Sequence, residues 1–187
     1  MDAFLISTGL VALAEMGDKT QLLSLLLAAR FRKPIPILIA ILAATILNHA
    51  LAAALGQWVT GLLGPDVLRW ILGISFLLMA GWMLIPDQLG DEDESIARWQ
   101  RFGVFGTTFI LFFMAEIGDK TQVATVALAA RFDALWTVLA GTTLGMMLAN
   151  APAVFIGDKM AGRLPLKAIH TVAALIFAGL GIWAILA

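Results

Sequence analysis

The octapeptide Ala14-Glu15-Met16-Gly17-Asp18-Lys19-Thr20-Gln21 returns as Ala115-Glu116-Ile117-Gly118-Asp119-Lys120-Thr121-Gln122, 101 residues later. A second match, Ala28-Ala29-Arg30-Phe31 with Ala129-Ala130-Arg131-Phe132, keeps the same offset. Chance does not repeat so polar a word in so apolar a chain, and internal repeats are established before a fold is assigned. The sequence therefore predicts two copies of one structural unit.

The composition predicts a membrane protein. Of 187 residues, 61% are apolar and 13% are charged, and the mean hydropathy is +0.95. A soluble domain carries roughly a quarter charged residues, so this chain has too few ionic groups to cover a surface in water. This excludes a soluble enzyme, a DNA-binding protein and a secreted module. The net charge of -1 gives no attraction to nucleic acid. The absence of cysteine excludes disulfides and thiolate metal sites.

Apolar runs between charged and proline-containing breakers predict six membrane spans, since one span needs about 20 apolar residues. They cover residues 3–29, 36–61, 67–85, 103–130, 135–157 and 166–186. Met1-Asp2-Ala3-Phe4 has no basic region of the signal-peptide kind, so we expect the first apolar segment to be retained. The expected fold is therefore an all-α, polytopic membrane protein with one repeated motif in its first span and one in its fourth.

The number of spans in each half predicts how the halves are related. Residues 1–85 and 103–187 would each hold three spans, and residues 86–102 would form an acidic linker. Three is odd, so the second half enters the membrane from the opposite side. The prediction is an inverted repeat about an axis in the membrane plane, the arrangement with which transporters build a central site with alternating access.

Loop charges predict the orientation. Ten basic residues are compared: two in the N-terminus and the loops after spans two and four, and eight in the other loops. The first set is Arg69 and Arg131; the second is Arg30, Arg32, Lys33, Arg98, Arg101, Lys159, Arg163 and Lys167. We therefore expect a multi-pass protein of the cell inner (plasma) membrane with the linker in the cytoplasm and both termini outside.

The repeated motif carries the candidate chemistry. Glu15, Asp18 and Lys19 share one helix face by their spacing, and the second copy repeats them. Ionised groups inside a bilayer cost several kcal/mol unless they are paired or face water. The glycine in each motif weakens the helix or lets a neighbouring backbone approach. If the two motifs meet at the midplane, four carboxylates and two ammonium groups give a charge of -2, which complements one divalent cation.

The candidate ligands are oxygen donors, which suit manganese, calcium and magnesium better than copper or zinc. They are Glu15, Asp18, Glu116, Asp119, Thr20, Thr121, Gln21 and Gln122, together with Asn48 and Asn150 in spans two and five. The asparagines either bind the cation or hydrogen-bond between helices. Lys19 and Lys120 would balance charge and act as gates, or the ion pairs merely hold the halves together.

Several other polar residues have structural readings. Ser24 and Thr125, one turn beyond each motif, are typical of small polar residues that join membrane helices. His49 has no counterpart in the second half, so we expect a hydrogen-bonded interhelical histidine rather than a ligand. Arg30 and Arg131 mark the membrane interface, with a gating role left open. Glycines in spans three and six permit close packing within one copy or in a homo-oligomer.

The twin signature Glu-x-Gly-Asp-Lys-Thr, Glu15 to Thr20 and Glu116 to Thr121, resembles that of the Gdt-type family of manganese and calcium cation/proton exchangers. The resemblance extends over two three-span halves joined by an acidic loop. It implies that Glu15, Asp18, Glu116 and Asp119 bind the cation, with Thr20 and Thr121 beside them. The compact chain resembles bacterial members, for which manganese export is the usual assignment.

The resulting hypothesis is a secondary antiporter, not an enzyme, that exports Mn²⁺ in exchange for protons. No resident cofactor is expected; the partners are the transported Mn²⁺ or Ca²⁺, protons and the lipid bilayer. A Ca²⁺/H⁺ antiporter of the same architecture is the first alternative. An intramembrane lipid-phosphate phosphatase is disfavoured because the motif holds no Ser/His/Arg constellation, and a passive channel because a tightly ligating site slows permeation.

Overall fold

The computed structural model describes residues 1–85, 92–156 and 166–186. All regular elements in these ranges are helical, as expected. They are α1 (Asp2–Glu15), α2 (Lys19–Phe31), α3 (Pro34–Leu62), α4 (Pro65–Met83), α5 (Glu92–Trp99), η1 (Gln100–Phe102), α6 (Gly103–Glu116), α7 (Lys120–Phe132), α8 (Leu135–Ile156) and α10 (Leu166–Leu186).

Both motif-bearing segments are broken at their glycine. Gly17 has a φ of 82° and Gly118 a φ of 76°, a left-handed conformation that side chains with a Cβ rarely adopt. The chain ends α1 at Glu15 and restarts as α2 at Lys19, and it repeats this break between α6 and α7. Across the second break the helices bend by 68°. The predicted weakening of the helix at these glycines is confirmed.

Four described helices are long and apolar enough to cross a membrane: α3, α4, α8 and α10. They correspond to four of the six predicted spans. The bent pair α6–α7 qualifies as a fifth, broken crossing. The predicted first span, 3–29, is divided into α1 and α2, of 14 and 13 residues. The structure thus supports a multi-pass membrane protein with four to five candidate spans.

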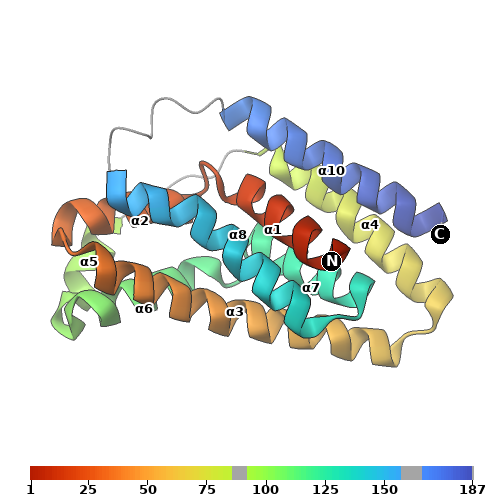
Figure 1. Cartoon of the computed structure of the whole chain (residues 1–187), viewed down its shortest axis with the longest axis horizontal. Coiled ribbons are helices and arrows are strands. Elements are labelled where there is room, and N and C mark those ends of the chain that lie inside the picture. The colour runs from red at the N-terminus through yellow and green to blue at the C-terminus, as the bar shows by residue number, and fades with distance from the viewer. Residues whose placement is uncertain (86–91, 157–165, 187) are drawn as a thin grey trace.

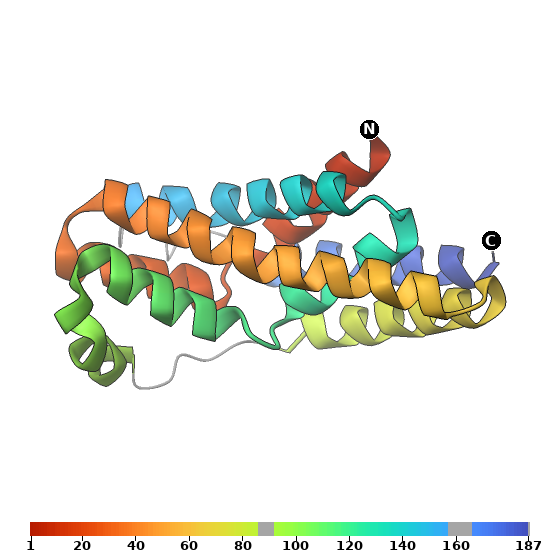
Figure 2. The same cartoon turned by 90° about the horizontal axis from the view of Figure 1, so that it is seen from below.

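The two broken segments run in opposite directions through the middle of the molecule. In Figure 2, α1 and α2 run from right to left, whereas α6 and α7 run from left to right. Helix α1 packs along α8, and α6 packs along α3. Each broken segment therefore lies against a long helix of the other half, and the two breaks face each other.

Helices α4 and α10 pack against each other and form a pair (Figure 1). The pair contacts α1 and α7. A Cβ on Gly181 would lie 2.9 Å from the Gly73 carbonyl oxygen, so these helices touch through their backbones. These two glycines thus pack within one copy of the chain. A Cβ on Gly81 or Gly179, by contrast, would meet nothing within 4 Å.

Seven of the ten basic residues compared above separate between the two ends of the molecule, whereas Lys167 belongs to the first turn of α10, which begins near the middle (Figure 1). The α2–α3 turn, with Arg30, Arg32 and Lys33, lies at the same end as α5 and η1 (Figure 2). The α3–α4 and α7–α8 turns lie at the other end, near Arg69 and Arg131. Lys159 and Arg163, which also enter the predicted orientation, lie outside the described residues.

The expected linker 86–102 contains a helix. Residues 86–91, with Asp87 and Asp91, lie outside the described part, but α5 follows and packs on α6. Ile96 of α5 is fully buried, which attaches this acidic segment to the bundle. The acidic composition had given no sign of this contact, because it depends on one apolar side chain.

Candidate metal centre

Four helix ends meet in the centre of the molecule. Glu15 and Glu116 are the last residues of α1 and α6, and Asp18 and Asp119 are the N-caps of α2 and α7. The N-terminus of a helix carries a partial positive charge that favours a nearby carboxylate. The C-termini bring carbonyl oxygens whose helical partners are missing. Two broken segments therefore gather anionic side chains and helix ends at one place.

Each motif folds in the same way around its break. The Thr20 hydroxyl donates to Glu15 Oε2 at 2.6 Å, and the Gly17 N–H donates to Gln21 Oε1 at 2.8 Å. The Gln side chain reaches back from the first turn of α2 and satisfies an N–H that the break leaves without a helical acceptor. This local cap explains why the Gln follows the glycine at this spacing.

The second motif repeats these bonds. Thr121 donates to Glu116 Oε2 at 3.1 Å, and the Gly118 N–H donates to Gln122 Oε1 at 2.7 Å. Both threonines thus hold a glutamate, and both glutamine oxygens, which the sequence offered as cation ligands, already accept a hydrogen bond. The repeat in sequence is a repeat in geometry.

The two motifs converge. Glu15, Asp18 and Asp119 each place a carboxylate oxygen within 4.8 Å of the others, so the cluster takes ligands from both halves. Glu15 also lies within electrostatic range of Glu116. The exposed fractions of these four side chains are 0 to 3%. The predicted meeting of the motifs is therefore present in the structure.

Three of these carboxylates keep an oxygen available. Glu15 Oε1, Glu116 Oε1 and Asp119 Oδ2 are buried and accept no hydrogen bond from any described residue. Leaving a buried ionised oxygen unsatisfied costs several kcal/mol. A cation or a proton at this place removes that cost.

The two motif lysines have different partners. Lys19 Nζ lies 3.0 Å from Asp119 Oδ1, an ion pair between the two halves, and its side chain is 29% exposed. Lys120 is buried and donates from Nζ to the Ile85 carbonyl oxygen at 3.0 Å, at the end of α4. Lys19 therefore joins the two halves at the carboxylates, and the Lys120 bond ties α7 to the residue that follows α4.

The asparagines lie in a shell around the motifs. Asn150 Oδ1 lies 2.9 Å from the Ser24 hydroxyl, and Gln21 Nε2 donates to the Ala149 carbonyl oxygen at 2.8 Å. In the other half Asn48 Nδ2 donates to the Phe113 carbonyl oxygen at 3.1 Å, and Gln122 Nε2 lies 3.4 Å from Asn48 Oδ1. These bonds attach α8 and α3 to the motifs.

Of the two small polar residues expected to join helices, Ser24 joins α2 to α8 through Asn150, whereas Thr125 bonds within its own helix. The Thr125 hydroxyl donates to the Thr121 carbonyl oxygen at 2.7 Å, inside α7. It therefore helps to satisfy the backbone of its own helix rather than the carboxylate cluster.

One histidine differs from the expectation, and a second reaches the site without having been predicted. His49 is fully buried, and neither ring nitrogen has a hydrogen-bond partner among the described residues, so the expected hydrogen-bonded histidine is wrong. His170, which the sequence pattern does not single out, has Nε2 2.7 Å from the Met16 carbonyl oxygen at the first break. No repeat or spacing pointed to it, because its counterpart position in the first half holds a different residue.

Comparisons with known proteins identify the family of this chain. The sequence pattern of the family "Divalent cation/proton antiporter GDT1" matches residues 3–91 and 104–187. A Vibrio cholerae protein named "Putative manganese exporter" is 58% identical over 178 residues, which cover 95% of this chain and 87% of that protein.

More distant relatives span the same length. A GDT1-like protein of Synechocystis is 29% identical over 95% of this chain and 93% of its own. The "Divalent cation/proton antiporter GDT1" of Saccharomyces cerevisiae is 22% identical over 95% of this chain and 81% of its own. No solved structure matches the chain. With its two halves matched and its acidic motifs converging, the chain belongs to the GDT1 family of divalent cation/proton antiporters, which are membrane transporters and not enzymes.

Proposed function

We propose that this protein exports Mn²⁺ from the cytoplasm in exchange for protons, through a cation site at the centre of the molecule. One observation carries the proposal: Glu15, Asp18 and Asp119, from both halves, bring carboxylate oxygens within 4.8 Å of one another in a buried place. Hard divalent cations take oxygen ligands, and clustered carboxylates supply the opposing charge.

The proposed ligands are the four motif carboxylates. Glu116 is included for two reasons. Its buried Oε1 accepts no hydrogen bond from the described residues, and its carboxylate is close enough to Asp18 and Asp119 to interact with them electrostatically. Thr20 and Thr121 orient the two glutamates. Gln21 and Gln122 hold the breaks, and Asn48 and Asn150 hold the neighbouring helices.

Exchange follows from the charge of the site. Carboxylates this close in a medium of low polarity repel one another, so they must be neutralised by a cation or by protons. Mn²⁺ and H⁺ therefore compete for the same oxygens, and release of one favours uptake of the other. The Vibrio cholerae relative is named for manganese export, which supports Mn²⁺ as the cargo.

An antiporter must expose its cation site to each side of the membrane in turn. The opposite directions of α1–α2 and α6–α7 in Figure 2 support an inverted repeat of six spans, with residues 1–85 and 103–187 as the halves. The separation of basic residues supports both termini outside, in the inner membrane. Such a repeat exposes one central site alternately to each side.

The proposal is tested by Mn²⁺-dependent proton flux in proteoliposomes. Glu15→Gln and Glu116→Gln remove one charge each from the centre, and we expect each to reduce exchange by at least about 100-fold, the loss of one buried charged ligand worth 3 kcal/mol or more. Glu94→Gln is the control, since Glu94 is 74% exposed on α5 and, among the described residues, pairs with Arg98 alone. Exchange at the wild-type rate by either motif variant would refute the site. Transport of Ca²⁺ in preference to Mn²⁺, when both are present, would refute Mn²⁺ as the transported ion.

A further inference from the structure

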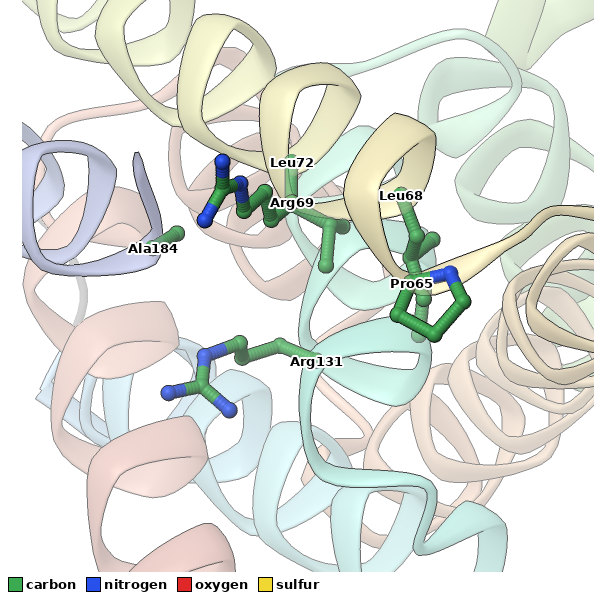
Figure 3. Close-up of a pocket in the computed structure, with 7 residues that line it drawn as sticks. Pro65, Leu68, Arg69, Leu72, Arg131 and Ala184 are labelled. Carbon is green, nitrogen blue, oxygen red and sulfur yellow. The ribbon is translucent and has the colours of Figure 1, made fainter. Parts of the chain in front are cut away.

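A second charged place lies away from the motifs, where α4, α7 and α10 meet (Figure 3). It is a pocket of about 240 Å³ whose walls include Arg69, Leu68 and Leu72 from α4, Arg131 from α7 and Ala184 from α10. We call it the guanidinium pocket. In Figure 3 both arginine side chains extend toward the same side of the pocket, one above the other.

The guanidinium pocket has a charge of +2 that its walls do not neutralise. Its lining residues include no carboxylate. The Arg131 guanidinium lies over the Trp183 ring, 4.1 Å from the ring centre, and no carboxylate of the described residues lies within 4.0 Å of it. Arg69 lies 3.8 Å from Asp66, but Asp66 is 90% exposed, and such surface pairs contribute little.

This chemistry fits a phosphate group. The planar guanidinium group of arginine presents N–H donors in a geometry that matches phosphate oxygens. The Trp183 ring stacks on the face of the Arg131 guanidinium, which leaves the N–H groups along the guanidinium edge available to a ligand. Two guanidinium groups, from α4 and α7, line this one pocket.

The surroundings identify the source of the phosphate as a lipid. Trp70 and Trp183 are 50% and 47% exposed beside the two arginines, and exposed tryptophans are typical of the membrane interface. Apolar side chains near the pocket also face outward, among them Val67 at the start of α4 and Leu186 at the end of α10. A phospholipid would place its phosphate on the arginines and its acyl chains along these helices.

We propose that the guanidinium pocket binds the headgroup phosphate of an anionic phospholipid. The lipid phosphate then joins Arg69 of α4 to Arg131 of α7, and so attaches the α4–α10 pair to the helix that follows the second motif. The site is independent of the cation centre, because it shares no residue with it.

The test uses the purified full-length protein and native mass spectrometry. Phosphatidylglycerol, phosphatidylcholine and inorganic phosphate are titrated separately. Near a membrane surface each basic residue contributes about 1 kcal/mol to anionic-lipid binding, so we expect Arg69→Gln to weaken phosphatidylglycerol binding about fivefold and the Arg69→Gln/Arg131→Gln protein roughly 25-fold. Phosphatidylcholine carries the same phosphate but compensates its charge with its own choline group, so we expect the same variants to change its binding much less.

Arg30→Gln is the matched control, because Arg30 is the repeat counterpart of Arg131, donates to Gln100 and does not line the guanidinium pocket. It retains phosphatidylglycerol binding. Arg69 is half-exposed, so Arg69→Gln alone decides the question if the double variant does not fold. Equal phosphatidylglycerol binding by the Arg69→Gln and wild-type proteins overturns the site. Inorganic phosphate binding as tightly as phosphatidylglycerol overturns the lipid assignment.

Discussion

An ammonium group of the repeated motif lies directly beside the carboxylate cluster. Lys19 lies at the carboxylate cluster and pairs with Asp119, whereas Lys120 reaches the end of α4. An ammonium group tethered beside a cation site competes with the cation for the same oxygens. The ion pair with Asp119 therefore gives Lys19 this competing role.

Lys19→Gln should consequently bind Mn²⁺ more tightly than the wild-type protein. One ion pair at a partly exposed position is worth up to about 1 kcal/mol, so the expected gain is roughly fivefold in the dissociation constant. Isothermal titration calorimetry at constant pH measures it. Arg98→Gln, which removes an exposed pair on α5, should leave the affinity unchanged. Weaker or unaltered Mn²⁺ binding by Lys19→Gln would contradict the competing role.

Much of the centre could be predicted at the residue scale, because its chemistry is written in adjacent residues. The octapeptide contains the carboxylates of the centre, and its duplication predicts that the carboxylates of the two copies lie close together. The contacts from elsewhere in the chain could not be predicted. The Ile85 carbonyl oxygen and His170 reach the motifs through tertiary packing, and neither has a repeat counterpart that marks it.

At the scale of the helices, the breaks depend on backbone conformation more than on space. Gly118 has a φ of 76°, and a Cβ built there meets nothing within 4 Å. A side chain at this position is therefore penalised only by the left-handed conformation. That isolates the energetic cost of the break from any steric clash.

Gly118→Ala should destabilise the protein by about 1–2 kcal/mol, the cost of left-handed backbone for a residue with a Cβ. Gly9→Ala is the matched control: a Cβ there also meets nothing within 4 Å, but Gly9 lies inside α1. We expect that substitution to stabilise α1 by roughly 0.5–1 kcal/mol. Denaturant unfolding followed by circular dichroism in detergent compares them. Equal stability of the two variants would show that the left-handed backbone at position 118 imposes no cost on a residue with a Cβ.

The long apolar helices could be predicted from the sequence, whereas the short helix α5 could not. Apolar runs located α3, α4, α8 and α10, since helices in lipid are apolar on every face. Helix α5 was missed because an eight-residue acidic segment has no such signal, and its attachment rests on Ile96.

For the whole molecule, the sequence left open where the α4–α10 pair sits. Helix α4 packs on α7, and α10 packs on α1. Contacts of α4 with α6 and of α10 with α2 are at most marginal among the described residues. Both α1 and α7 lie on the same side of the breaks, toward the two termini (Figure 2). The pair therefore covers one side of the centre, an arrangement that residue patterns do not encode because it depends on the conformation.

If the halves are related by an inverted repeat, exchanging their roles gives the other conformation of the transporter. Helix α4 would then lie on α6, and α10 on α2, so the pair would cover the opposite side of the centre. The pair moves as a unit in this scheme, because the backbones of α4 and α10 touch at Gly73 and Gly181.

Cross-linking tests this movement without background, since the chain has no cysteine. Leu68 and Ala130 line one pocket between α4 and α7, so Leu68→Cys/Ala130→Cys joined by a short, reducible thiosulfonate linker should abolish Mn²⁺/H⁺ exchange until a reductant restores it. Leu84 and Thr171 line a groove between α4 and α10. The same linker in Leu84→Cys/Thr171→Cys joins helices that move together and should leave exchange intact. Undiminished exchange with α4 fixed to α7 would mean that the α4–α10 pair is static and that access to the centre changes by motion of the broken helices.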